Sequence, residues 1–290
     1  MFFFVRSQHK NVSSLASKSV AINSIRIRMS ADFSTLDRVK LVCCVGVSTE
    51  EFFCRPWMRH FVEHYLKLGI QPHNFRLSLH VRRLGADNEW AEAFLRRFDI
   101  CVAGILTGEY ECYTFHERNL EEIAKCHEDD WILYADFDEY VEPPYPLAEL
   151  IRRLDRGYFN VMHGRLIDRV ATNGRLVAVA ESPSPWEQYP DVAPLTEELV
   201  VGCPDKIPFM KKEIVPSMGH HFVLNTEMAR APRKQIAVHH FKWDATIIPR
   251  LELTLKRFQT DPRRYYWLDE VERVLAKLDG GRIADEYLKK

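Results

Sequence analysis

The stretch WILYADFDEYVEPP, residues 131 to 144, carries the strongest indication of the fold. Its first five residues are uncharged and mostly apolar, and a cluster of acids begins at Asp136. An apolar run without polar alternation is typical of a central strand that helices cover on both faces. In open α/β sheets, ligands bind outside the carboxyl ends of such strands. The acids therefore predict a ligand site at the end of a strand.

Asp136 and Asp138 form the only D-x-D pair in the sequence, and Glu139 continues the acidic cluster. With the backbone still extended, both aspartates would project to one side of the strand and Phe137 would face into packing. Two convergent carboxylates are suitable ligands for Mn²⁺ or Mg²⁺, which complete their coordination with phosphates and water. The alternative is an acidic turn at the positive end of the next helix, expected over residues 146–154.

The composition excludes several classes of protein. The chain has 290 residues, of which 46% are hydrophobic, and these suffice for a full core. A formal net charge of −1 gives no overall attraction for nucleic acid, so we expect no nucleic-acid partner. Seven cysteines without a C-x-x-C spacing argue against a disulfide framework and a zinc knuckle, and they favour a reducing compartment.

Residues 1–37 differ from the rest and are interpreted as a leader. Basic residues alternate with serines and apolar residues, and no acid precedes Asp32. If residues 1–30 are a transit peptide, the destination is an organelle, either a plastid or a mitochondrion. If they are a disordered tail, or if translation starts at Met29, the chain is expected in the cytoplasm. No apolar run reaches the roughly 18 to 20 residues of a membrane span, so we expect a soluble intracellular protein.

From residue 38 onward, short apolar runs alternate with amphipathic segments, which predicts an α/β fold with a mixed, mainly parallel sheet flanked by helices. Strands are expected over residues 40–47, 75–81, 100–106 and 131–135. Helices are expected over residues 55–69, 89–98 and 117–128, with apolar positions at helical spacing.

The second half of the chain contains three further predicted features. Asn173-Gly174 between two strand-like runs predicts a hairpin, with Arg165, Asp168 and Arg169 on one arm. The proline-rich residues 181–194 predict a long loop. Two amphipathic helices, over 249–258 and 265–278, are expected on the outer face of the sheet.

One family resemblance accounts for these features together. Trp131, Asp136, Asp138 and Glu139 match a W-x4-D-x-D-E pattern, and the preceding ERNLEEIAKCHEDD (117–130) and the later DKIPFMKK (205–212) match the same branch. In these segments the chain resembles the family 2-like glycosyltransferases of GT-A fold, over roughly residues 39 to 260. It departs from the commoner family pattern at VSTEEFF (47–53), where only Glu50 or Glu51 matches the usual Asn-Glu pair.

The resemblance implies a Rossmann-like GT-A domain over residues 38–290. Its nucleotide-binding half would be 38–142, its acceptor half 143–260, and its C-terminal helices 261–290. It implies a nucleotide-diphosphate sugar donor and a Mn²⁺ or Mg²⁺ ion held by Asp138 and Asp136. A late histidine, His221 or His240, is the expected third ligand.

Other residues are expected to complete the site. Arg118 and Asn119 match the Arg-Asn pair of that branch and are expected to contact the diphosphate or the base. Lys242 is expected to meet a phosphate as a point charge. Glu187 and Asp191 are candidates for the general base of an inverting transfer, with retention left open.

The sequence leaves the donor sugar, its base and the acceptor open, and the acceptor could be a carbohydrate, a lipid or a protein. Two other functions remain as alternatives. One is a catalytically inactive relative that binds a nucleotide or carbohydrate, and the other is a different metal-dependent phosphate-transfer enzyme. No glycine-rich phosphate loop of the Walker type is present, which disfavours the second.

Overall fold

The computed structural model describes residues 34–260 and 268–288. The predicted leader, residues 1–37, lies outside the described residues except for its last four positions. Thr35 is buried, and Leu36 packs against the main hydrophobic core, so these positions belong to the domain. None of the helices in the described ranges has the length and apolar character that a membrane crossing requires.

Parallel strands alternate with helices in the first half of the chain, as the sequence predicts. The strands are β1 (Val39–Gly46), β2 (Phe75–Val81), β3 (Gly104–Thr107) and β4 (Trp131–Tyr134). The helices are α2 (Arg55–Lys67), α3 (Ala86–Arg96) and α4 (Cys112–Ala124). β1 lies between β2 and β4, and β3 pairs with β2. Strand β3 starts four residues later than predicted and α4 five residues earlier.

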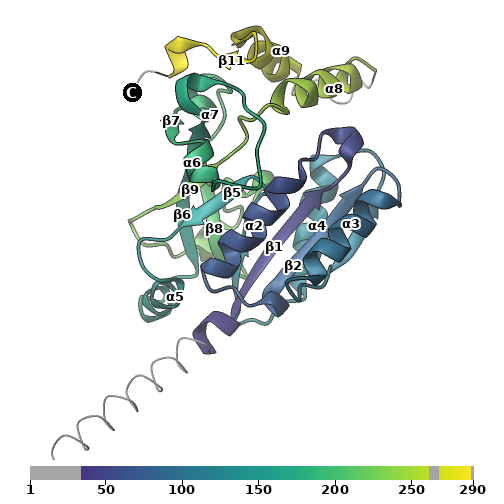
Figure 1. Ribbon diagram of the computed structural model, residues 1–290. Coiled ribbons are helices and arrows are strands. Elements are labelled where there is room, and N and C mark those ends of the chain that lie inside the picture. The colour runs from purple at the N-terminus through teal and green to yellow at the C-terminus, as the bar shows by residue number, and fades with distance from the viewer. Residues whose placement is uncertain (1–33, 261–267, 289–290) are drawn as a thin grey trace, which may run out of the picture.

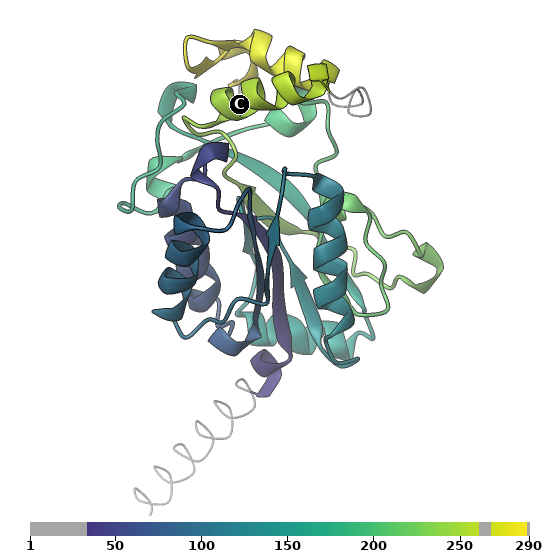
Figure 2. The ribbon, with the colours of Figure 1, turned by 90° about the vertical axis from the view of Figure 1, so that its right-hand side faces the viewer.

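Helices cover both faces of this parallel sheet, which Figure 2 shows edge-on between them. Leu41 of β1 belongs to a core with Phe61 of α2, whereas the next residue, Val42, packs in a second core with Ile123 of α4. Successive side chains of a strand point to opposite faces, so a fully covered strand must be apolar throughout. The predicted α/β class is confirmed.

The second half adds strands β5 (Glu139–Glu142), β6 (Val161–Val170), β7 (Asp191–Ala193), β8 (Asp205–Lys211) and β9 (Ile236–His240), and helix α5 (Leu147–Arg156). The strand order is β3-β2-β1-β4-β8-β6-β9-β5, and β7 pairs with β6. Four of the eight pairings described in this sheet are parallel and four are antiparallel. The sheet is therefore mixed: three of the parallel pairings lie in the first half of the chain, and the fourth joins β6 to β9.

The sheet curls on itself (Figure 1). A tight turn joins β4 to β5, although β8, β6 and β9 separate these strands in the sheet order. In a flat sheet four strand spacings would amount to about 19 Å, and a four-residue turn spans less than about 7 Å. The curl brings the start of β5 back to the end of β4, where Glu139 of β5 contacts Lys206 of β8.

The C-terminal elements form a cap instead of lying on the outer face of the sheet. They are α8 (Ile247–Thr260), α9 (Leu268–Lys277), β10 (Leu278–Asp279) and β11 (Arg282–Ile283), and they share a hydrophobic cluster with α7 (Leu195–Glu198) and Trp243. In Figure 1 this cap lies beyond the ends of β1 and β2. Arg257 of α8 pairs with Glu51, which follows β1, at 2.6 Å.

The predicted hairpin at Asn173-Gly174 is absent, although the turn itself forms. Both residues have positive φ, 60° and 67°, as two-residue hairpin turns require. The chain after the turn is not a strand: Arg175 bridges to Arg282, and the antiparallel partners of β6 are β7 and β8. β7 and the one-turn helix α6 (Pro185–Gln188) both come from the segment expected to be a loop.

Candidate metal and nucleotide site

The backbone does not stay extended after β4. The Glu139 N–H donates to the Asp136 carbonyl oxygen at 3.0 Å, which closes a turn over residues 136–139. Phe137 packs against Phe61, with ring centroids 5.2 Å apart, as expected. Because of the turn, Asp136 and Asp138 have different partners and do not form one parallel pair.

Asp138 faces His240 at the end of β9. The His240 Nε2 atom lies 3.6 Å from the Asp138 carboxylate, and its Nδ1 atom lies 2.8 Å from the carboxylate of Asp168 on β6. Burial acts against a charged imidazole, but the two carboxylates outweigh it and raise the pKa of His240 to about 9. Burial likewise acts to raise the pKa of Asp138, but His240 lowers it to about 2. The two side chains form an ion pair.

Asp168 fixes the orientation of His240 from behind. Its carboxylate is 2% exposed and accepts hydrogen bonds from the Thr196 N–H (2.6 Å), the Thr196 hydroxyl (2.9 Å) and the Trp243 indole (3.0 Å). With Nδ1 held by a carboxylate, His240 directs Nε2 at Asp138. Histidines that bind metals usually have their second nitrogen held in this way.

Asp136 belongs to a second cluster, with Glu139, His220 and Lys206. The ligand atoms of the first three lie within 4.8 Å of one another, so these side chains could hold a metal ion. The Lys206 ammonium lies among them, 3.1 Å from Asp136, 2.5 Å from Glu139 and 3.5 Å from His220 Nε2. Burial acts to raise the pKa of Asp136, but Lys206 and His220 hold it well below its usual range.

The structure brings His220, not its neighbour His221, to these carboxylates. Gly219 and His220 have φ of 68° and 44°, a left-handed bend in the turn η4 (Met218–His220) that is uncommon for a histidine. The His220 ring stacks on Tyr134 at 4.3 Å between centroids. His221 instead hydrogen-bonds the Asp205 carbonyl oxygen, at 2.9 Å from Nδ1.

The two expected nucleotide contacts on α4 have other partners. Arg118 pairs with Glu121 and Glu122 of its own helix, each at 2.7 Å, and donates to the Ser78 hydroxyl of β2 at 2.8 Å. Asn119 is buried and donates to the Tyr134 hydroxyl at 3.2 Å. Both side chains therefore serve the contact between α4 and the sheet in this structure.

Within the described residues, the remaining expected side chains have contacts other than with the carboxylate clusters, or none. Glu187 accepts hydrogen bonds from the Ser184 N–H (3.1 Å) and hydroxyl (2.5 Å), an N-terminal capping arrangement for α6. Asp191 begins β7 and is half-buried. Lys242 follows β9, and its ammonium lies 6.0 Å from the centre of the Trp243 ring.

A charged network covers the ends of β1, β2 and β3. Arg257 of α8 bridges Glu51 (2.6 Å) and Glu109 (2.9 Å), and Glu109 also pairs with Arg82 at 2.7 Å. His80 at the end of β2 is 1% exposed, and its Nδ1 atom has no hydrogen-bond partner among the described residues. Polar groups from three strand ends and the C-terminal cap thus meet where open α/β sheets bind ligands.

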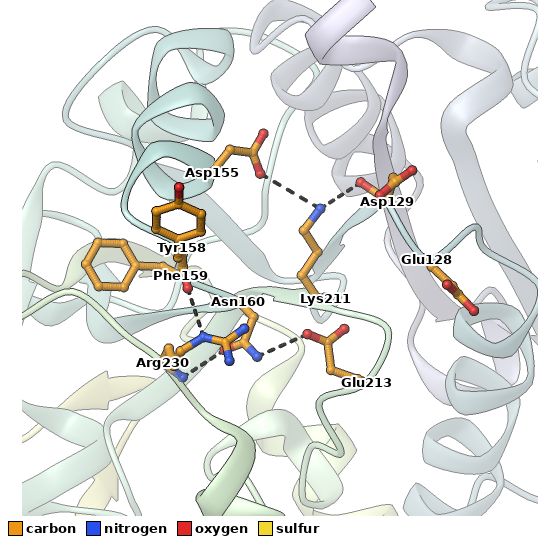
Figure 3. Close-up of a pocket in the computed structure, with 9 residues that line it drawn as sticks. All are labelled: Glu128, Asp129, Asp155, Tyr158, Phe159, Asn160, Lys211, Glu213 and Arg230. Atoms are coloured by element: carbon orange, nitrogen blue, oxygen red, sulfur yellow. Dashed lines mark hydrogen bonds and ion pairs between the residues drawn. The ribbon is translucent and has the colours of Figure 1, made fainter.

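A separate pocket of about 210 Å³ lies at the opposite end of β4 (Figure 3). Its polar groups largely bind one another: Asn160 donates to Glu213 at 3.0 Å, and Lys211 donates to the Asp129 carbonyl oxygen at 2.7 Å. Arg230 donates to the Tyr158 carbonyl oxygen at 2.9 Å. This mutual pairing leaves few groups for a ligand.

Sequence reasoning missed Lys206, His220 and Arg257, and it treated Asp168 only as part of a hairpin. Two of these had a signal in the sequence. Lys206 opens the otherwise apolar run KIPFM, and Asp168 interrupts the apolar positions of LIDRV. Charged residues at such positions are rarely buried unless they are paired.

No family model matches the sequence, and no curated protein is significantly similar to it. Several solved structures are similar at low identity. Staphylococcus aureus TarS is 11% identical with a TM-score of 0.36, and the match covers 84% of this chain and 44% of TarS. TarS 1–349 in complex with UDP has the same identity and TM-score, over 82% and 71% of the two chains.

A 4-diphosphocytidyl-2C-methyl-D-erythritol synthase is also 11% identical, with a TM-score of 0.33 over 82% of this chain and 98% of the synthase. This chain spans less than half the length of the larger of the two TarS structures. At these values the similarities do not bear on function.

Proposed function

We propose that this protein is a metal-dependent glycosyltransferase of GT-A type that uses a nucleotide-diphosphate sugar. One observation carries the proposal. Asp138 and the Nε2 atom of His240 face each other across 3.6 Å at the carboxyl end of β4, and buried Asp168 holds the other side of the imidazole. The position in the sheet is that of a ligand site, and the side chains are those of a metal site.

The residues present fit a Mn²⁺ or Mg²⁺ ion. A carboxylate and an imidazole are both ligands for Mn²⁺, and Asp136 lies close enough to interact with the charge of Asp138. Asp138 and His240 would hold the ion. When bound, such an ion would neutralise negative charge on the departing diphosphate.

The nucleoside would lie over the ends of β1, β2 and β3. His80 has a buried nitrogen with no partner among the described residues, and a hydrogen bond from the base or ribose would satisfy it. The Glu51 carboxylate lies 4.0 Å from the same imidazole and would be a second group that hydrogen-bonds the base or ribose. Arg257 would stay on the cap side of the nucleoside and screen these acids from the diphosphate.

Of the two acids considered as general base, we assign the role to Asp191. Glu187 is committed to Ser184, and the hydrogen bonds from Ser184 lower its pKa and weaken it as a base. No hydrogen bond or ion pair from the described ranges engages the Asp191 carboxylate, which can accept the proton of an acceptor hydroxyl. Transfer would then proceed with inversion.

The test is calorimetric titration of UDP, GDP and their sugar conjugates into the full chain, with Mn²⁺ and again with EDTA. We expect one nucleotide to bind only with the ion. Asp138→Asn should abolish this binding because it removes a ligand. Asp129→Asn is the matched control, since Asp129 is an exposed aspartate at the opposite end of β4.

Product analysis then separates the alternatives. Release of the nucleoside diphosphate from the bound donor supports glycosyl transfer, and release of the sugar 1-phosphate with transfer of the nucleoside monophosphate would indicate nucleotidyl transfer instead. Nucleotide binding without turnover on any acceptor would favour an inactive binding protein. Binding that is equally strong with EDTA and in Asp138→Asn would exclude the metal site.

A further inference from the structure

The Asp136, Glu139 and His220 cluster has ligands for a metal ion, but a cation from the chain already lies within it. Lys206 on β8 is 2% exposed, and its ammonium reaches Glu139 at 2.5 Å and Asp136 at 3.1 Å. The same ammonium donates to the Gly219 carbonyl oxygen at 2.9 Å. An ammonium has three N–H donors, and here each has an acceptor.

A divalent ion at this cluster would have to displace Lys206. Glu139 and His220 are as buried as the lysine, so a displaced ammonium would lose its acceptors in a buried setting, which is costly for an unpaired charge. If the ammonium stayed, it would repel the ion at a separation of a few ångströms. Either outcome opposes metal binding here.

Asp138 differs from this cluster in its exposure to solvent and in the cation that it faces. Its carboxylate is 30% exposed, and its partner is an imidazole, which can lose its proton and become a ligand. Lysine has no comparable option while two carboxylates surround it. The two neighbouring clusters therefore differ in kind although both contain a carboxylate and a histidine.

We propose that Lys206 is the permanent cation of the Asp136, Glu139 and His220 cluster, excludes divalent ions from it, and positions Asp136. The Asp136 Oδ2 atom is held by Lys206, and no hydrogen bond in the described ranges engages Oδ1. The Asp136 side chain is 45% exposed, so its Oδ1 atom faces the solvent side of the cluster. Asp136 is then a hydrogen-bond acceptor for the donor sugar; this last role rests on the proposed function.

The experiment measures ion binding without any substrate. Mn²⁺ is titrated calorimetrically into the wild-type chain, Glu139→Gln, Lys206→Met and Lys211→Met. Lys211 lies on the same strand, but its ammonium contacts residues at the other end of β4, so it is the matched control. Thermal melts with and without Mn²⁺ provide a second readout.

We expect Glu139→Gln to keep the wild-type affinity and stoichiometry, because Glu139 binds Lys206 and no ion. Lys206→Met should bind one more equivalent of Mn²⁺ than the wild type, and its melting temperature should rise more on addition of the ion. Lys211→Met should behave as the wild type does. Loss of ion binding in Glu139→Gln, or no extra binding in Lys206→Met, would overturn the inference.

Two further outcomes of this experiment also test the inference. If Lys206→Met does not fold alone, refolding with Mn²⁺ should recover it, and failure to recover would count against the inference. If the wild type binds no ion, the proposed metal site at Asp138 fails. Gain of binding in Lys206→Met still decides the role of Lys206 in that case.

Discussion

Asp168 controls the orientation of His240 although it is itself buried. It receives four hydrogen-bond contacts, from His240, the Thr196 backbone and hydroxyl, and Trp243. Its negative charge also helps to raise the pKa of His240. A residue of this kind affects ion binding without touching the ion.

We expect Asp168→Asn to weaken Mn²⁺ binding by about 10- to 100-fold, the usual effect of removing the partner of a metal-binding histidine. Calorimetric titration measures the affinity, and far-UV circular dichroism checks that the fold is retained. Asp205→Asn, a substitution of a half-exposed aspartate on β8, is the control. Equal affinities for both variants would mean that Asp168 is only structural.

We predict that the buried imidazole of His64 makes the folded protein less stable in mild acid. Burial lowers its pKa to about 4, although its ring hydrogen-bonds the Val141 carbonyl oxygen at 3.0 Å. Below pH 6.5 the unfolded chain takes up a proton that the folded chain resists. Stability is therefore full above about pH 6.5 and falls toward pH 4, by up to about 3 kcal/mol from this residue.

Urea unfolding at pH 7.5, 6 and 5 should show this slope, and His64→Gln should reduce it. Glutamine can still donate to the Val141 carbonyl oxygen but does not titrate. His221, whose pKa burial also lowers to about 4, contributes to the remaining slope. An identical pH dependence in the variant and the wild type would refute the assignment to His64.

At the scale of elements, the sequence predicts the parallel half well and the antiparallel half poorly. β2 agrees with its prediction at both ends, because a covered strand must be apolar throughout and turn residues bound it. The partner of β6 could not be predicted, because Asn173-Gly174 determines only a local turn. The chain after this turn instead bridges to Arg282 of β11, a contact with a residue far along the chain that no local pattern indicates.

The start of α8 depends on one buried side chain, Asp244. It is 2% exposed, accepts the Trp57 indole N–H at 2.7 Å, and accepts the Thr246 N–H at 2.7 Å in the turn that leads into α8. Asp244→Ala leaves a buried indole donor unpaired and removes a cap, for a combined loss of about 3 kcal/mol.

Urea unfolding of Asp244→Ala against Asp269→Ala tests this prediction. Asp269 is an exposed aspartate in the first turn of α9, so its loss should change stability little. A difference between the two variants of less than about 0.5 kcal/mol, the usual range for a surface substitution, would contradict the role of Asp244.

At the scale of the whole molecule, the two ends of the parallel sheet differ in kind. At the carboxyl ends, the His80 nitrogen of β2, which has no partner among the described residues, lies near Glu51, and Arg257 of the cap pairs with Glu51. At the opposite end of β4, the pocket in Figure 3 is occupied by its own hydrogen bonds. Ligands are therefore expected at the first end only.

Hydrogen–deuterium exchange can test this difference. With Mn²⁺ and the nucleotide that binds, we expect slower amide exchange over residues 46–54, 80–85, 107–111 and 135–139. Residues 155–160 and 211–213, around the opposite pocket, serve as the internal reference and should not change. Protection at the opposite pocket alone would relocate the binding site.

The sequence by itself determined the parallel α/β half and the position of the acidic cluster after β4, because both follow from local patterns: apolar runs, helical spacing, and acids directly after a strand. It also singled out Asp138 and, with His221, His240, whose role as metal ligands stays a prediction. Only the tertiary structure decided that Asp136 and Asp138 diverge, that His220 faces the carboxylates in place of His221, and that Lys206 lies among them. The reason is physical. These contacts arise where a curled sheet brings β4, β5, β6, β8 and β9 together, and side chains on separate strands leave no periodic trace in the sequence.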